Sequence, residues 1–277
     1  MTDLSIIQPF LYTVFDNETL TAEVMTTYDI VGRPVAWQEN LRQEMSRFLS
    51  RVFQSPKDWE YMVRHFFWVP EENCRRVAVL VRNKAYELVA MAICDHGVFP
   101  YESGLLHLVY IHARAILPEY QGMGLGKKLS LAILNDLNPD ILYTSCAQSS
   151  SLHSWVALPE KKQVKGYKAY PRLVTLEDGS RKAMTCPLHC LGFALDNFKN
   201  IYLNHVKGSF QRVEDVVRNI TVFLIRKNVC IDYDYDPWMR QGAPDLLAKA
   251  LKLEAGDCVL AMLVKDEVDA RFFNTLK

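Results

Sequence analysis

Three glycines stand close together in the run Gln121-Gly122-Met123-Gly124-Leu125-Gly126. Glycine lets a backbone approach a ligand without interference from a Cβ atom and leaves its N–H groups accessible. The apolar residues that follow have helical spacing, and a helix that begins at such a loop adds unpaired N–H groups and the positive end of its dipole. The run therefore predicts a binding site for an anion such as a phosphate group.

Two common phosphate-binding motifs do not fit this run. The P-loop, G-x-x-x-x-G-K-[ST], requires a glycine where Gln121 stands and a serine or threonine where Lys128 stands. The dinucleotide fingerprint, G-x-G-x-x-G, requires a third glycine where the sequence has Lys127 or Leu129. Both nucleotide motifs are thus excluded.

Strand and helix signals flank the loop. Residues 104–117 form an apolar run with strand character, which ends at Leu117-Pro118. After the loop, apolar residues recur at four-residue steps until Asn138-Pro139 stops the helix: Leu125, Leu129, Ile133 and Leu137. Residues 141–146 are then predicted to form a second strand, parallel to the first, which completes a β–α–β unit.

The loop resembles the pyrophosphate-binding loop of the GNAT superfamily of acyl-CoA N-acyltransferases. That loop has the pattern Q/R-x-x-G-x-G/A, which Gln121, Gly124 and Gly126 match. Residues 116–120 resemble the strand exit that precedes the loop in the family, and the resemblance is strong over residues 75–150. It implies an α/β fold with a GNAT-like mixed central sheet, splayed parallel strands and flanking helices.

The resemblance also implies a co-substrate and a reaction. Acetyl-CoA or another acyl-CoA would donate an acyl group directly to an amine within a ternary complex. The splay that admits the pantetheine arm would lie between residues 115–117 and residues 144–146. The residues that would bind acyl-CoA belong to the strand exit and the loop: Ile116, Leu117, Gln121, Gly122, Met123, Gly124, Leu125, Gly126 and Lys127. The acceptor amine is left open.

Acyl transfer to an amine requires a base for the amine and an acid for the leaving thiolate. His107 and His112 are candidate bases because histidine titrates near neutral pH, and strand alternation predicts that they point to opposite faces. Glu102 is a third candidate base, acting through water. The resemblance implies a tyrosine acid after the second parallel strand, and Tyr167 and Tyr170 are nearest to that position, although the surrounding motif departs from the family pattern.

Cysteines and two incomplete motifs suggest other chemistry that we do not expect. Cys146 is predicted to be a buried strand thiol without an activating base, which is normally inert. The segment Cys186-Pro187-Leu188-His189-Cys190 lacks a second pair of zinc ligands, and Asp232, Asp234 and Asp236 lack the glycine and glutamate of a calcium loop. We predict no metal site.

Residues 161–172 are the most basic segment of the chain, with five basic residues and two tyrosines. Such a segment could border the phosphates of CoA or bind a nucleic acid by charge and stacking, and it could equally be a solvated loop. Two alternatives to an enzyme that acts on a small or protein amine therefore remain open. One is a GNAT-like enzyme that modifies tRNA or DNA, and the other is a catalytically inactive CoA-binding interaction module.

Composition limits the partners and the location. The chain has 277 residues, is 49% hydrophobic, and carries 32 basic and 32 acidic residues, so no net field favours a nucleic acid or a membrane surface. Seven scattered cysteines suit a reducing compartment. No signal peptide or membrane-spanning stretch is visible, so we expect a cytoplasmic protein without membrane contact. The oligomeric state is left open.

Local patterns predict further elements on both sides of the loop. Upstream they are a strand, two helices and a hairpin: 23–31, 36–53, 58–68, and 76–82 with 87–95. Downstream, Ser149, Ser150 and Ser151 offer caps for a helix, followed by a strand, a helix and a strand: 221–231, 245–253 and 257–264. We divide the chain into an acyltransferase domain, 1–185, and a C-terminal α+β extension, 186–277, which completes the sheet or forms a small appendage.

Overall fold

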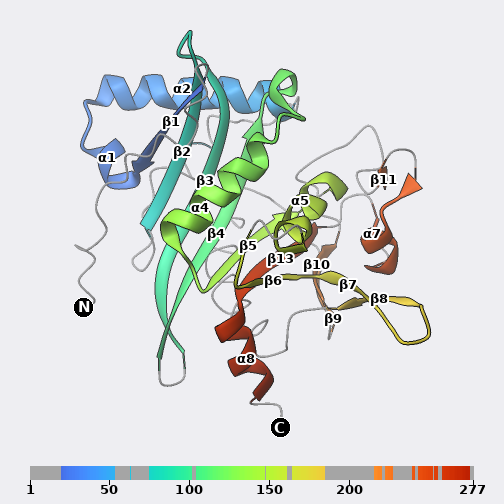
Figure 1. The fold of residues 1–277 in the computed structure, drawn as a ribbon. Coiled ribbons are helices and arrows are strands. Elements are labelled where there is room, and N and C mark those ends of the chain that lie inside the picture. The colour runs from blue at the N-terminus through green and yellow to red at the C-terminus, as the bar shows by residue number, and fades with distance from the viewer. Residues whose placement is uncertain are drawn as a thin grey trace. The chain divides into compact units, whose positions relative to one another are not determined.

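The computed structural model describes most of the central part of the chain and parts of its ends (Figure 1). The described residues are 20–53, 63, 75–101, 104–146, 148–160, 164–184, 215–219, 222–226, 239–240, 243–251, 253–254 and 258–274. Their elements are β1 (Leu20–Thr26), α1 (Thr27–Val31), α2 (Val35–Phe53), β2 (Arg75–Asn83), β3 (Leu88–Tyr101), β4 (Gly104–Ile116), the 3₁₀ turn η2 (Pro118–Tyr120), α4 (Leu125–Leu137), β5 (Ile141–Cys146), α5 (Ser149–Glu160), β6 (Tyr167–Tyr170), β7 (Arg172–Thr175), β8 (Arg181–Met184), β9 (Asp215–Asn219), β10 (Val222–Arg226), β11 (Met239–Arg240), β12 (Ala243–Pro244), α7 (Leu246–Leu251), β13 (Cys258–Lys265) and α8 (Asp266–Asn274).

The chain divides into two compact units. The first unit comprises residues 1–98 and 111–136, and the second comprises residues 99–110 and 137–277. Strand β4 runs through both, because its first half belongs to the second unit and its last six residues belong to the first. The domain boundary at residue 185 remains a prediction.

The first unit is built on a sheet with the strand order β1-β2-β3-β4. Strands β1, β2 and β3 pair in antiparallel fashion. Helix α2, predicted over 36–53, buries Leu41, Met45, Phe48 and Leu49 along one face. Figure 1 shows α2 crossing behind the strands and α4 lying in front of them, so the strands are covered on both faces. This explains why β2 and β3 are almost continuously apolar.

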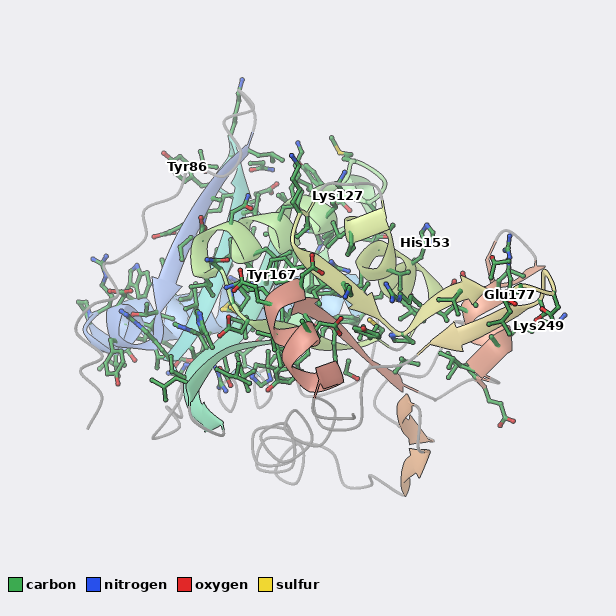
Figure 2. The ribbon with its side chains drawn as sticks, turned by 60° about the horizontal axis from the view of Figure 1, so that its bottom comes forward. Tyr86, Lys127, His153, Tyr167, Glu177 and Lys249 are labelled. Carbon is green, nitrogen blue, oxygen red and sulfur yellow. The ribbon has the colours of Figure 1, made fainter. Side chains whose placement is uncertain are left out.

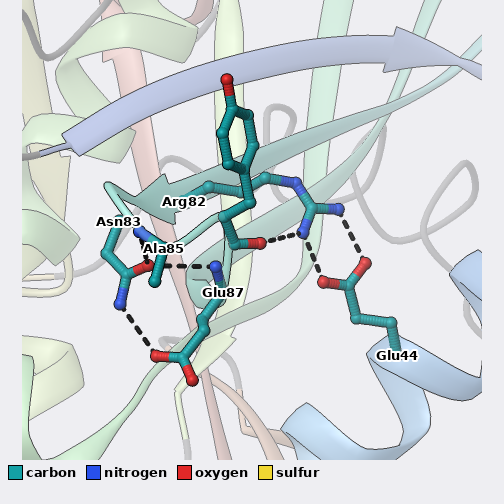
Figure 3. Close-up of polar contacts among 6 residues, drawn as sticks. Glu44, Arg82, Asn83, Ala85 and Glu87 are labelled. Atoms are coloured by element: carbon teal, nitrogen blue, oxygen red, sulfur yellow. Dashed lines mark hydrogen bonds and ion pairs between the residues drawn. The ribbon is translucent and has the colours of Figure 1, made fainter.

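The predicted hairpin between β2 and β3 is confirmed (Figure 3). The side-chain oxygen of Asn83 accepts hydrogen bonds from the backbone N–H groups of Ala85 and Glu87, at 2.9 and 3.0 Å, which closes the turn. Arg82 donates to the carbonyl of Tyr86 at 3.0 Å and forms a bidentate ion pair with Glu44 of α2. The Glu44 hydrogen bond raises the pKa of Arg82 further above its ordinary value. This network joins α2 to the β2–β3 turn.

The strand predicted over 23–31 is wrong in its second half. Strand β1 ends at Thr26, and residues 27–31 form helix α1. The reason is a capping box: Thr26 accepts from the N–H of Asp29, and the Asp29 carboxylate accepts from the N–H of Thr26 at 2.7 Å. These bonds satisfy N–H groups at the start of the helix and end the strand.

The second unit has the strand order β4-β5-β13-β10-β9, with β6 pairing to β13. Strands β4 and β5 are parallel, as predicted, and β13 is antiparallel to β5, so the sheet is mixed and the fold is α/β. The predicted helix 245–253 and strand 257–264 correspond to α7 and β13. The tail therefore contributes a strand to this sheet, with Val259 opposite Cys146 and Val264 opposite Ile141.

Several predictions fall outside the described residues. They concern the helix over 58–68 except Val63, the candidate base Glu102, the segment 186–190, and Asp232, Asp234 and Asp236. Among the residues that are described, no helix is long and apolar enough to cross a membrane.

Candidate functional site

The predicted anion-binding loop is anchored to strand β4 in the first unit. The N–H of Leu117 donates to the carbonyl of Val89 on β3 at 3.0 Å, which holds the strand exit in the sheet. The side-chain amide of Gln121 donates to the carbonyl of Ile116 at 3.0 Å. Gln121, the first residue of the motif, therefore closes the turn, and the glycines follow it.

The three glycines of the loop are needed for two different reasons. Gly122 and Gly124 have φ angles of +79° and +76°, and a Cβ atom on either would meet no atom within 4 Å. Their backbone conformation requires glycine, and the space around them is open. Gly126 has no positive φ, but a Cβ atom there would lie 3.2 Å from Cδ1 of Ile116 and 3.6 Å from Nε of Arg114. A side chain at position 126 would therefore need Ile116 on β4 to shift by a few tenths of an ångström.

The first turn of helix α4 carries an unusual set of charges. The helix begins at Leu125, and Lys128 donates its N–H to the carbonyl of Gly124 at 3.0 Å. The first turn contains Lys127 and Lys128 and no acidic residue. A helix dipole favours anions at this end and disfavours cations. Lys127, labelled in Figure 2, is half-buried, and Lys128 is exposed.

Arg114 adds a third cation beneath this turn. Its Nη1 atom donates to the carbonyl of Gly126 at 3.1 Å and to the hydroxyl of Ser130 at 2.7 Å. Sequence reasoning missed this residue. The signal that could have found it is a lone arginine inside the apolar strand that leads into the loop.

His112 lies in a buried ion cluster of the first unit. Its Nε2 atom is 2.6 Å from Oδ2 of Asp95, and both side chains are at most 3% exposed. Arg76 donates to both oxygens of the same carboxylate, at 2.6 and 2.8 Å. Burial alone would raise the pKa of Asp95, but the charge of His112 and the hydrogen bonds from Arg76 hold it well below its usual range. Sequence reasoning missed Asp95 and Arg76, although charged residues inside apolar strand patterns are a signal for such pairing.

His107 has a different environment in the second unit. Its backbone N–H donates to the carboxylate of Asp140 at 2.9 Å, and its carbonyl accepts from the N–H of Asp140 at 2.8 Å. Burial lowers the pKa of the His107 imidazole, and this outweighs the opposite effect of the Asp140 charge. Lys265 donates to Asp140 at 3.2 Å and to the carbonyl of Asn138 at 2.8 Å. This region therefore anchors the turn between α4 and β5.

Both candidate tyrosine acids are hydrogen-bonded within the second unit. The Tyr167 hydroxyl donates to the carbonyl of Pro139 at 2.6 Å, and burial together with the charge of Asp140 raises its pKa. The Tyr170 hydroxyl donates to Oδ1 of Asp269 at 2.7 Å and is buried. Their catalytic role remains a prediction, and these bonds show what each hydroxyl does in the fold.

The basic segment 161–172 is in part a strand rather than a loop. Residues 167–170 form β6, Lys168 pairs with Asp269, and the guanidinium of Arg172 lies 5.4 Å from the ring centroid of Tyr170. Lys165 is exposed. Residues 161–163 are outside the described part of the chain.

Cys146 and the serines at 149–151 belong to the second unit. Cys146 is fully buried at the end of β5. The three serines that were predicted as caps are themselves the first residues of α5, and the Ser149 side chain is buried. Within the described residues, no group of three or more histidine, cysteine, aspartate or glutamate side chains is arranged to hold a metal ion.

No protein-family model and no curated protein matches this sequence. An aminoglycoside acetyltransferase from an uncultured soil metagenomic sample, solved with sisomicin, is 18% identical over 53% of this chain and 87% of its own, with a TM-score of 0.34. The ribosomal-protein-S18-alanine N-acetyltransferase from Escherichia coli is 15% identical over 58% of this chain and 88% of its own, with a TM-score of 0.32. The NatC complex bound to Gag peptide and CoA is 15% identical over 57% of this chain and 94% of its own, with a TM-score of 0.34.

The order of the elements around the loop agrees with the resemblance stated for the sequence. Strand β4 leads into the glycine loop, α4 follows it, and β5 returns parallel to β4. The fold is GNAT-like.

Proposed function

We propose that this chain is an acyl-CoA-dependent N-acyltransferase whose loop, residues 121–126, binds the phosphates of acyl-CoA together with the first turn of α4. The observation that supports this most is the start of α4. Two glycines with positive φ leave the backbone open, and they lead into a turn with two lysines and no acidic residue. The positive end of the helix dipole and the two lysines both favour an anion at this end of α4.

The reaction would form one bond and break one. The amine nitrogen attacks the thioester carbonyl, a C–N bond forms, the C–S bond breaks, and the amine proton passes to a base while the thiolate takes up a proton. We assign the base to His112 in preference to His107, because Asp95 can orient its imidazole and stabilise the protonated form. His112 also lies four residues before Ile116 on β4, whereas His107 lies nine residues before it.

A specific observation favours a second candidate, a CoA-binding module without turnover. The hydroxyls of Tyr167 and Tyr170 both donate to acceptors of the protein itself. A hydroxyl that donates to a protein acceptor must break that hydrogen bond before it can protonate a leaving thiolate. This candidate shares the phosphate-binding loop with the enzyme and differs from it only in chemistry.

Calorimetric titration with CoA and acetyl-CoA tests the binding step. Gly124→Ala is the test variant, and Gly179→Ala in the β7–β8 turn is its matched control. The two glycines have φ angles of +76° and +77°, and neither Cβ atom would meet a neighbour within 4 Å, so both substitutions place an alanine at a similar positive φ in open space. We expect wild type and Gly179→Ala to bind CoA and Gly124→Ala to bind about tenfold more weakly or worse. A folded wild-type protein that does not bind CoA contradicts the proposal.

Release of free CoA thiol from acetyl-CoA then tests turnover. The acceptor panel would contain an aminoglycoside, a polyamine, a peptide with a free N-terminus and tRNA. Product formation on one of them supports the enzyme, and CoA binding without turnover on all of them supports the binding module. Acceptor binding that weakens steeply with salt would distinguish tRNA from the small amines.

A further inference from the structure

Three ionisable side chains of the first unit meet on adjacent strands of the sheet. Arg76 of β2 and Asp95 of β3 stand directly opposite each other in the antiparallel register, so they share one face. His112 of β4, the next strand in the sheet, reaches the same carboxylate. All three side chains are at most 3% exposed. Because apolar residues of similar size are often at least as stabilising as a buried ion pair, stability alone is a weak reason for this cluster.

The two oxygens of the Asp95 carboxylate have different partners. Nε of Arg76 donates to Oδ1 at 2.6 Å, and Nη2 of Arg76 donates to Oδ2 at 2.8 Å. Nε2 of His112 lies 2.6 Å from the same Oδ2. The planar fork of the guanidinium holds the plane of the carboxylate with two N–H···O bonds. Arg76 therefore determines where Oδ2 stands relative to the imidazole.

The charge of Asp95 determines the role of Nε2 in this contact. Burial raises the pKa of Asp95, but the charges and hydrogen bonds of His112 and Arg76 hold that pKa well below its usual range, so the carboxylate is ionised. An ionised carboxylate only accepts hydrogen bonds. Nε2 of His112 must therefore carry a hydrogen and donate it, and a further proton that the imidazole takes up goes to Nδ1.

The groups on the same face as His112 come from β4 itself, from the neighbouring strands and from α4. Arg114 lies two residues further along this face of β4 and donates to α4. The residues that α4 buries are uncharged. On β3, Cys94 points to the other face, and burial together with the charge of Asp95 raises the pKa of its thiol, which stays neutral. Asp95 is the group that binds the imidazole, and Arg76 binds the same carboxylate.

We propose that Arg76 is a positioning residue for His112 and acts through Asp95: it keeps Nε2 as the donor, directs the proton of the attacking amine to Nδ1, and weakens the hold of the carboxylate on the imidazolium. This inference rests on the proposed function. In that reaction the amine nitrogen loses one proton to Nδ1, and the electron pair of the broken N–H bond stays on the nitrogen of the new amide. A base that is already protonated cannot take this proton, so a cation that disfavours the imidazolium helps His112 to act.

The test follows the ring nitrogens of His112 by NMR in protein labelled with 15N-histidine, as the pH is varied and without ligand. The 15N shifts distinguish the Nε2–H form, the Nδ1–H form and the imidazolium, and His112→Gln identifies the signals of this residue among the seven histidines. Arg76→Gln removes the charge and keeps an amide donor, whereas Arg76→Lys keeps the charge without the fork.

Arg82→Gln is the matched control. Arg82 lies on the same strand as Arg76 and also forms a bidentate ion pair, with Glu44 of α2. Circular dichroism shows which variants are folded. Arg76→Met, which is also neutral, carries the test if Arg76→Gln does not fold, and the form of the neutral imidazole is measured in the wild type without any variant.

We expect the neutral imidazole of the wild type to be the Nε2–H form. In Arg76→Gln the midpoint of the His112 titration should rise by about one pH unit, because a positive charge near the imidazolium is lost. Arg76→Lys should stay within about half a unit of wild type, and Arg82→Gln should leave the midpoint unchanged. If an amine of the acceptor panel is acylated, the acidic limb of kcat/KM against pH should move with this midpoint, which a loss of stability alone would not produce.

Three results overturn the inference: an Nδ1–H form in the folded wild type, an unchanged midpoint in the folded neutral variant, or an acidic limb that stays in place while the midpoint moves. The first two are independent of CoA binding. A folded wild type without CoA affinity contradicts the proposed function, and the role of His112 as a base fails with it, whatever the titration shows.

Discussion

The first turn of helix α8 carries Asp266, Glu267 and Asp269, whereas the first turn of helix α4 carries Lys127 and Lys128 and no acidic residue. The start of α8 follows the rule that acidic side chains complement the helix dipole. The start of α4 breaks that rule.

The charged side chains at the two helix starts interact differently with the helix dipole. At α8, the acidic side chains serve the fold: the buried carboxylate of Asp269 accepts from Tyr170 and pairs with Lys168 of strand β6. At α4, the charges oppose the dipole, and the glycines before the turn leave the backbone open. Departures from a local rule of this kind are more common at functional sites than elsewhere, which agrees with the function proposed for this loop.

Buried carboxylates provide the largest test of this comparison. Asp95 of the first unit pairs with Arg76 and His112, whose side chains are each 3% exposed, while Lys168, which pairs with Asp269, is 37% exposed. Asp95→Asn should cost about 3–5 kcal/mol, because it takes the carboxylate away from the buried Arg76 guanidinium. Asp269→Asn should cost about 1–3 kcal/mol, because Lys168 can reach water. Urea unfolding followed by circular dichroism measures both, and a smaller loss for Asp95→Asn than for Asp269→Asn would contradict this ranking.

The loop glycines give the second test, which separates conformational strain from close packing. Gly124→Ala and Gly126→Ala should each destabilise the protein by about 1–2 kcal/mol, the first through its positive φ and the second through contact with Ile116. Adding Ile116→Val removes the Cδ1 atom that the new Cβ would meet. We expect it to offset part of the loss in Gly126→Ala and none of the loss in Gly124→Ala. Thermal unfolding of the double variants measures this, and equal effects of Ile116→Val in both backgrounds would argue against two separate reasons.

Charge reversal at the two helix starts gives the third test. Lys127→Glu should stabilise the ligand-free protein by about 0.3–1 kcal/mol and weaken CoA binding, because an acidic residue suits the dipole but repels phosphate. Glu267→Lys in α8 should destabilise by a similar amount without changing CoA binding. Urea unfolding and calorimetry on the same samples measure the two effects. A destabilising Lys127→Glu would show that the lysine serves the fold, and the contrast between the two helices would disappear.

The smallest expected effect concerns the pH dependence of the second unit. Burial lowers the pKa of His107, so between the folded value and the ordinary value, about 6.5, the unfolded chain binds more protons than the folded one. Stability from this group is therefore complete above about pH 6.5 and is lost as the pH falls through the folded pKa. His107→Gln should remove this loss, and its stability relative to wild type should improve from about pH 8 to about pH 5. Urea unfolding measures the difference in unfolding free energy between the variant and wild type. A difference that stays constant over that pH range would contradict a lowered pKa of His107.

Local patterns in the sequence predicted the elements around the loop. The apolar run before the loop, the glycines and the four-residue repeat from Leu125 to Leu137 all act over a few residues, and β4, α4 and β5 appear where these patterns place them. The error in the predicted end of the first strand has a local cause as well. The Thr26 and Asp29 side chains form the capping box, a three-residue spacing that the strand interpretation overlooked.

Pairing over long sequence separations could not be predicted from such patterns. Strand β13 pairs with β5 although more than a hundred residues separate the two strands in the sequence. Strand β6 also pairs with β13. The basic segment 161–172 therefore contains a strand that is held by Asp269, a residue about a hundred positions later. Strand partners are chosen by the packing of the whole sheet, and no short window of sequence contains that information.

The sequence by itself determined the glycine loop, the helix that follows it and the GNAT resemblance, because backbone conformation and helical periodicity depend on residues that are near one another in the chain. Only the tertiary structure decided that Gly126 packs closely against Ile116, that Arg114 lies against the start of α4, and that Asp95 binds His112. These contacts join different strands and a helix, so side-chain packing and buried charge pairing bring them together after the local elements have formed.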